Sequence, residues 1–107
     1  MSVEQISAPE LSAMLERKEP VYLLDVRQPW EHELARLNDQ LLIPLQELPE
    51  RLDEVVPAGA LVVCYCHHGV RSLSAAALLS AQGIRAASLR GGIEAWSLQI
   101  DPAIARY

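Results

Sequence analysis

The residues best suited to chemistry form one short stretch that begins at Cys66. An apolar run at 61–65 precedes it and predicts a buried strand, while an Ala- and Leu-rich segment at 72–82 follows it and predicts a helix. Cys66 therefore falls at a strand-to-helix turn, where the first N–H groups of the helix lack partners and the helix dipole favours negative charge. A thiol at this position is biased toward the thiolate and an anion is stabilised beside it, which indicates sulfur or phosphate chemistry.

The chain has a second cysteine, Cys64, and the two are expected to differ in role. Free cysteines are among the most buried residue types, so a structural role is the alternative to chemistry for each of them. Cys64 lies inside the apolar run and is assigned that structural role. Cys66 is followed by two histidines, a glycine and an arginine, and this polar setting favours a functional role.

Length and composition restrict the class of protein. The 107 residues are half apolar and are expected to form one domain, 1–107, with a single hydrophobic core. The net charge is −5 and the basic residues are scattered, which argues against nucleic-acid binding. The sequence has neither the pattern of a signal peptide nor an apolar stretch long enough for a membrane span. Two cysteines in a Cys-x-Cys pattern do not form a disulfide framework, so a reducing cytoplasm is the expected location.

Short apolar segments alternate with amphipathic ones along the whole chain. Strands are expected at 3–6, 21–26, 41–43, 61–65 and 86–89, and helices at 7–18, 29–34, 48–56, 72–82 and 93–98. This alternation predicts an α/β fold with a central parallel sheet of about five strands and helices on both faces. Ligands of such sheets bind at the carboxyl ends of the strands, and Cys66 lies at such an end.

Three separated motifs resemble those of the rhodanese-like sulfurtransferase family, in particular of its single-domain members. Leu-Asp-Val-Arg at 24–27, followed by Glu31, resembles the family's first motif, with His32 where an aromatic residue is usual. The stretch at 66–72 is similar to the family's active-site loop. Gly-Gly-Ile-Glu-Ala-Trp at 91–96 is similar to a motif near the family's C-terminus. Together the three motifs span nearly the whole chain in the family's order.

One segment departs from the family pattern. Ala-Arg-Leu-Asn-Asp-Gln at 35–40 stands where the family typically has Gly-His-Ile-Pro-Gly-Ala. The loss of both glycines and the proline removes preset turn geometry, although Asn38 and Asp39 still adopt turn conformations readily. The departure leaves open the local backbone and a partner surface at this segment, but not the cysteine loop.

The resemblance implies an enzyme that moves a sulfane sulfur through a Cys66 persulfide. The donor would be a small anion such as thiosulfate, or a persulfide, and the acceptor a thiol, cyanide or a sulfur-carrier protein, with no cofactor. This is covalent, ping-pong catalysis with Cys66 as the nucleophile. The residues that follow would bind the substrate, chiefly through backbone N–H groups arranged as a nest for anionic sulfur: His67, His68, Gly69, Val70, Arg71 and Ser72.

The sequence leaves two interpretations open for the side chain of Arg71. Its guanidinium either steers an anionic donor to the mouth of the loop or is a solvated side chain in the first helical turn. Asp25 and Arg27 fit a structural ion pair that braces adjacent loops better than a substrate contact. His67 and His68 are not expected to hold a metal ion, because no acidic cluster flanks them in the sequence.

The spacing within the loop separates sulfur transfer from its nearest competitor. Cysteine-dependent phosphatases carry Cys-x5-Arg, a loop that wraps a tetrahedral phosphate, whereas this chain has Cys-x4-Arg from Cys66 to Arg71. The shorter loop favours a terminal sulfur, since an ångström-scale misplacement costs about a hundredfold in rate. A cysteine-dependent phosphatase or arsenate reductase is therefore the less favoured alternative. A catalytically idle module that only binds a partner protein is the other.

Overall fold

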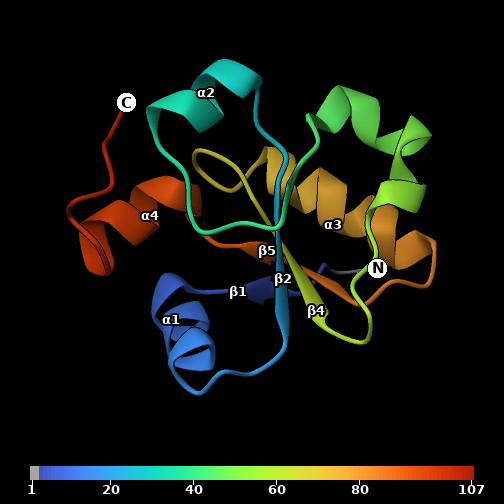
Figure 1. Cartoon of the computed structure of the whole chain (residues 1–107), viewed down its shortest axis with the longest axis horizontal. Coiled ribbons are helices and arrows are strands. Elements are labelled where there is room, and N and C mark those ends of the chain that lie inside the picture. The colour runs from blue at the N-terminus through green and yellow to red at the C-terminus, as the bar shows by residue number, and fades with distance from the viewer. Residues whose placement is uncertain (1–2) are drawn as a thin grey trace.

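A five-stranded parallel sheet forms the centre of the structure, a computed structural model that describes residues 3–107 (Figure 1). The strands are β1 (Gln5–Ile6), β2 (Val21–Asp25), β3 (Leu41–Leu42), β4 (Leu61–Tyr65) and β5 (Ala86–Leu89). Their order across the sheet is β1-β5-β4-β2-β3, so the strand that leads to Cys66 is the central one. The predicted parallel sheet of about five strands is confirmed.

Helices cover both faces of this sheet, as predicted. They are α1 (Ala8–Glu16), α2 (Pro29–Leu34), α3 (Arg71–Ala81) and α4 (Gly92–Gln99), with two 3-10 helices, η1 (Leu45–Glu50) and η2 (Leu52–Glu54). One core contains Leu11 of α1 and Ile93 of α4, and the other contains Leu48 of η1 and Leu79 of α3. Within residues 3–107, no helix combines the length and the apolar character that a membrane span requires.

The central strand β4 pairs with a neighbouring strand on each edge and packs into a hydrophobic core on each face. All five of its residues are buried, with Val63 and Tyr65 in the core of α1 and α4, and Val62 and Cys64 in the core of α3. It pairs with β2 on one edge and with β5 on the other. Alternating side chains of a strand point to opposite faces, so both cores hold β4 at once. The residue that follows β4, Cys66, therefore starts from a rigid base.

Residues 48–56 do not form the single amphipathic helix that the sequence predicts. This segment contains instead the end of η1 and the short η2. Pro49 lies inside η1, and a proline has no N–H to donate and its ring clashes with the carbonyl of an α-helix. Smaller differences concern ends: α1 begins at a capping box formed by Ser7 and Glu10, as predicted, but stops at Glu16 rather than near Lys18.

Helix α2 and the C-terminal residues 101–107 lie near the carboxyl ends of the strands. Figure 1 shows α2 and the C-terminal end of the chain on the same side of the molecule. Residues 101–107, for which the sequence predicted no structure, fold back past α4, where the Ser97 hydroxyl donates a 2.7 Å hydrogen bond to the Ile104 carbonyl. Tyr107 then lies edge-on to Trp30 of α2, with ring centroids 6.0 Å apart. This brings the end of the described chain to the level of the cysteine loop.

Candidate active site

The two cysteines are both free and buried, yet they differ in surroundings. Cys64 lies within β4, and burial raises the pKa of its thiol to about 12. Cys66 is the first residue after β4, and its side chain faces a loop that ends where α3 begins at Arg71. Only 1% of Cys66 is exposed, so a reacting group must approach its sulfur through the loop. The strand-to-helix placement expected for this cysteine is confirmed by the fold.

Three polar groups meet at the Cys66 sulfur. The N–H groups of Gly69 and Ser72 donate to Sγ over 3.1 and 3.3 Å, and the Ser72 hydroxyl lies 3.4 Å from it. Ser72 is buried, and its hydroxyl shares a 2.7 Å hydrogen bond with Ser88 of β5. Gly69 has φ +95°, a conformation that favours glycine and that turns its N–H inward. The two backbone donors stabilise negative charge on the sulfur.

The N-terminus of α4 holds the outer side of the loop. The N–H of Ile93 donates to the Cys66 carbonyl over 2.9 Å, and the N–H of Glu94 donates to the His67 carbonyl over 3.1 Å. Gly92, which has φ +62°, packs against the carbonyl groups of both Cys66 and His67. The double-glycine motif therefore makes a tight turn that packs directly against the loop. With these two carbonyls bound to α4, the first peptide groups of the loop cannot rotate freely.

Arg71 has a partner, Glu31, that local sequence patterns do not predict. Its guanidinium donates to both carboxylate oxygens of Glu31, over 2.6 and 2.9 Å, as a bidentate ion pair. Glu31 belongs to α2 and is 3% exposed. Burial alone would raise the pKa of Glu31, but hydrogen bonds from Arg71, the Gln28 N–H and the Tyr107 hydroxyl lower it to about 2. The same contact raises the pKa of Arg71, so both groups stay charged.

Asp25 and Arg27 form the structural ion pair that the sequence favoured. Both side chains are fully buried, with Nη2 and Nε of the guanidinium 2.7 and 2.9 Å from the two carboxylate oxygens. The remaining donors of Arg27 reach the Ala35 carbonyl, the Glu31 carbonyl and the Tyr107 hydroxyl. Burial alone would lower the pKa of Arg27, but its hydrogen bonds raise it instead. The pair ties the end of β2 to α2 and to the chain after it.

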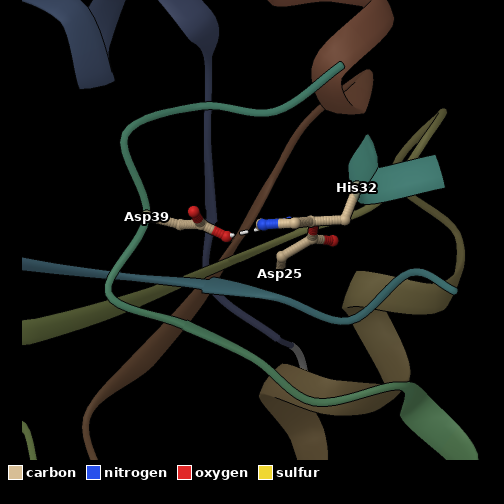
Figure 2. Close-up of side chains that lie close together, drawn as sticks. All are labelled: Asp25, His32 and Asp39. Carbon is tan, nitrogen blue, oxygen red and sulfur yellow. Dashed lines mark hydrogen bonds and ion pairs between the residues drawn. The ribbon is translucent and has the colours of Figure 1, made fainter. Parts of the chain in front are cut away.

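A second polar cluster, of Asp25, His32 and Asp39, lies beside this ion pair. Figure 2 shows the His32 ring directed at the two carboxylates, with Nδ1 2.9 Å from Asp25 and 3.5 Å from Asp39. The Tyr65 hydroxyl donates to Asp39, whose pKa is raised by burial. Within the described part of the chain, these three form the one group with metal-like spacing, but the Asp25 carboxylate already accepts two hydrogen bonds from Arg27. The cluster therefore joins the atypical segment at 35–40 to β2 and α2.

A row of aromatic rings borders the cysteine loop. The ring of His67 stacks on His68 on one side and on Tyr107 on the other, with centroids 3.9 Å apart in each case. Trp30 stands edge-on to Tyr107 and is 58% exposed. Burial lowers the pKa of His67, and its Nε2 atom is buried without a hydrogen-bond partner. The sequence offers one signal for Tyr107, the single aromatic residue in the tail at 101–107.

Comparison with known proteins connects this geometry to a family. The profile of the Rhodanese-like domain matches residues 7–99. A protein of Allochromatium vinosum named sulfurtransferase is 39% identical over 104 residues, which is 96% of each chain. A solved rhodanese-related protein from Thermoplasma volcanium aligns with a TM-score of 0.84 at 27% identity, over 97% of this chain and 99% of its own. A rhodanese-like domain protein from Staphylococcus aureus gives 0.82 at 28% identity, over 98% and 99%.

These matches extend well beyond the cysteine loop. They include the end of β2 that carries Asp25 and Arg27, and the glycine turn before α4 that holds the loop. The relative named for sulfur transfer supports a role of that general kind for this chain. The family profile covers most of the sequence, and the three motifs come together at the carboxyl ends of the strands. This chain therefore belongs to the rhodanese-like domain family.

Proposed function

We propose that this protein is a sulfurtransferase that carries a sulfane sulfur on Cys66. The Cys66 thiolate attacks the outer sulfur of thiosulfate or of a persulfide, a new S–S bond forms, and sulfite or a thiolate leaves with the electron pair of the broken S–S bond. The Cys66 persulfide then gives its outer sulfur to a thiol, to cyanide or to a sulfur-carrier protein. The thiolate is regenerated, so the cycle is ping-pong and involves no net oxidation of the protein.

One observation carries this proposal: two backbone N–H groups converge on the Cys66 sulfur at the start of α3. The donors from Gly69 and Ser72 lie 3.1 and 3.3 Å from Sγ, where charge must be stabilised before attack and again when the persulfide is discharged. The loop from His67 to Ser72 would hold the donor around this sulfur, with Val70 and His68 exposed at its rim. A short Cys-x4-Arg loop suits a terminal sulfur better than a tetrahedral phosphate.

The surroundings of the second cysteine support a single-thiol mechanism. Cys64 is held as a neutral thiol by its burial in β4, so it supplies neither a nucleophile nor a disulfide partner. A reducing cytoplasm would keep Cys66 in its reactive form between turnovers, and we place the reaction there. The sulfur acceptor then comes from outside the chain.

The test is the intact mass of the protein after incubation with a sulfur donor and removal of small molecules. Wild-type protein should gain the mass of one sulfur atom after treatment with thiosulfate or with glutathione persulfide, and should lose it again on addition of cyanide. Cys66→Ser should gain nothing from either donor, while Cys64→Ser should load like the wild type. An unchanged wild-type mass with both donors would contradict the proposal and favour a binding module.

A further inference from the structure

The charge of the loop's single cation is already neutralised. Arg71 is the one Arg or Lys between Cys66 and Ser72. Both of its contacts with Glu31 are short and aligned, at 2.6 and 2.9 Å, and the carboxylate side is almost fully buried. A bidentate pair of this kind fixes the planar guanidinium and satisfies it. An incoming oxyanion therefore meets an ion pair with no net charge, rather than a free cation.

Glu31 is held in this position by two further donors. The backbone N–H of Gln28 donates to one carboxylate oxygen over 3.0 Å, and the Tyr107 hydroxyl donates to the other over 2.7 Å. Tyr107 accepts in turn from the buried Arg27 over 2.9 Å. Because these contacts keep the pKa of Glu31 near 2, its negative charge is present throughout the physiological range. The neutralised state of Arg71 is thus built into the fold.

Aromatic and aliphatic side chains make up much of the remaining border of the site. Trp30 and Val70 are 58% and 72% exposed, and Tyr107 lies between Trp30 and His67. His67 has a lowered pKa because of its burial, so its ring is neutral at neutral pH. The protein as a whole carries a net charge of −5. A doubly charged inorganic anion gains little at such a border, whereas carbon groups next to a sulfur can contact the rings.

We infer that Glu31 is a specificity-determining residue that turns the site away from oxyanion donors and toward organic persulfides, R–S–SH. Tyr107 is the positioning residue that holds Glu31 against Arg71. In the step concerned, the Cys66 thiolate attacks the outer sulfur of R–S–SH, the bond between the two donor sulfurs breaks, and R–S⁻ leaves with its electron pair. The proton remains on the transferred sulfur. This inference rests on the proposed sulfur transfer and restricts the class of sulfur donor to organic persulfides.

The shared chemistry, an organic persulfide, has two sources. One is the persulfide of a small thiol, and the other is a persulfidated cysteine on a protein. Both present an outer sulfur on an organic group, and the exposed Trp30 and Val70 accommodate either. Glutathione persulfide and persulfidated albumin serve as probes of the two sources, with cyanide as the common acceptor and thiocyanate as the measured product.

The test compares kcat/KM for thiosulfate and for each persulfide probe. The wild type should use at least one persulfide about a hundredfold better than thiosulfate. Glu31→Gln keeps the size of the side chain but removes its charge and one of its two acceptor oxygens, which frees the charge of Arg71. Its kcat/KM for thiosulfate should therefore rise about tenfold while the persulfide values change little. Glu33→Gln, on the exposed side of the same helix, makes the same change in net charge and should leave the donor ratio as it is.

Salt dependence gives a readout that folding defects do not imitate. Added sodium chloride should not lower the wild-type rate with thiosulfate, since no free cation attracts the donor, but it should lower the rate of Glu31→Gln. Tyr107→Phe should move the donor ratio in the same direction by a factor of about two to three, mainly through KM, because Glu31 loses one donor.

Three results would overturn the inference. Equal use of thiosulfate and persulfides by the wild type is the first, and an unchanged donor ratio in folded Glu31→Gln is the second. A wild-type thiosulfate rate that falls steeply with salt is the third, and it decides the matter even when the variant does not fold. Failure to load sulfur from any donor would instead remove the proposed function itself, and the intact-mass measurement separates that case.

Discussion

Gly92 and His67 approach so closely that a Cβ atom on residue 92 would lie 2.4 Å from the His67 carbonyl oxygen. The same atom would lie 2.5 Å from the Cys66 carbonyl oxygen. Both of these carbonyls accept hydrogen bonds from the first turn of α4. The shape of the cysteine loop is therefore set by a helix that contributes no reactive side chain to it.

Gly92→Ala should abolish most sulfur transfer while leaving the sheet intact. The added methyl must push the loop away from α4, and a shift of about an ångström at the sulfur cradle costs on the order of a hundredfold in rate. The free energy of unfolding should fall by about 2–4 kcal/mol through the clash and the left-handed φ. Thiocyanate formation and urea unfolding measure the two effects.

Gly59→Ala is the matched control for that variant. Gly59 also has a positive φ, of +88°, but nothing lies within 4 Å of its missing Cβ. It should lose about 1–2 kcal/mol of stability from the backbone conformation alone and keep its sulfur-transfer rate. Equal activity losses in both variants would show that the contact between Gly92 and the loop is unimportant.

Cys66→Ser should abolish sulfur transfer without unfolding the protein, whereas Cys64→Ser should keep most of it. A serine hydroxyl does not ionise near neutral pH, so the first change removes the nucleophile. The second places a hydroxyl in the core of α3, which costs stability but no chemistry. Transfer from thiosulfate or glutathione persulfide to cyanide is the assay, with circular dichroism as the check on folding. Equal loss in both folded variants would mean that the cysteines act together as a redox pair.

Insertion of one glycine between Val70 and Arg71 should weaken sulfur transfer by about tenfold or more. The insertion restores Cys-x5-Arg spacing and moves the Ser72 N–H, which now lies 3.3 Å from the sulfur, away from it. The wider nest should bind tetrahedral anions more tightly, so inhibition by vanadate should increase. Phosphatase turnover is not required, because a general acid is not supplied by the insertion. Unchanged transfer in a folded insertion variant would show that loop length does not select the chemistry.

The ion pair of Glu31 predicts a specific loss of stability in acid. The folded-state pKa of Glu31 is about 2, below its ordinary value of 4.5, so the folded protein binds this proton less tightly than the unfolded chain. The stabilisation is fully present above about pH 4.5, amounts to about 3 kcal/mol, and is lost as the pH falls toward 2. Urea unfolding of wild type and Glu31→Gln across this range should show a stability difference that shrinks with the pH.

Glu33→Gln supplies the reference for the acid measurement. Its side chain is exposed on the same helix, so its stability relative to wild type should vary little with pH. A stability difference for Glu31→Gln that stays constant between pH 7 and pH 2 would argue that the contacts of Glu31 do not depend on its charge.

The local sequence predicts the framework of the site well. The apolar run of β4, the Ala- and Leu-rich α3 and the glycine turn before α4 each follow from short-range patterns, and together they place Cys66 correctly. The prediction of one helix over 48–56 is wrong because a proline such as Pro49 is also typical of the first turn of an α-helix, whereas here it lies inside the 3-10 helix η1, where it has no N–H to donate. Hydrophobic periodicity alone does not report that loss of a backbone donor.

The contacts that tune the site were harder to predict, since they join residues far apart in the chain. Glu31 and Arg71 are 40 residues apart, and each belongs to a different motif. The two motifs come together because β2 and β4 are neighbours in the sheet. The contact between Glu31 and Arg71 can therefore be expected only once the order of the strands is known. Tyr107 follows a tail without periodicity, and its contact with Glu31 depends on how that tail packs against α4.

Burial of Cys64 within β4 affects how long a persulfide on Cys66 would last. If the neighbouring Cys64 ionised readily, its thiolate would attack the inner sulfur (Sγ) of a Cys66 persulfide. A Cys64–Cys66 disulfide would form, and the outer sulfur would leave as hydrogen sulfide. The Cys64 thiol, with its pKa near 12 and no exposed surface, has almost no reactive form at neutral pH. In the proposed cycle, the lifetime of a sulfur loaded onto Cys66 would then be set by the concentration of the external acceptor.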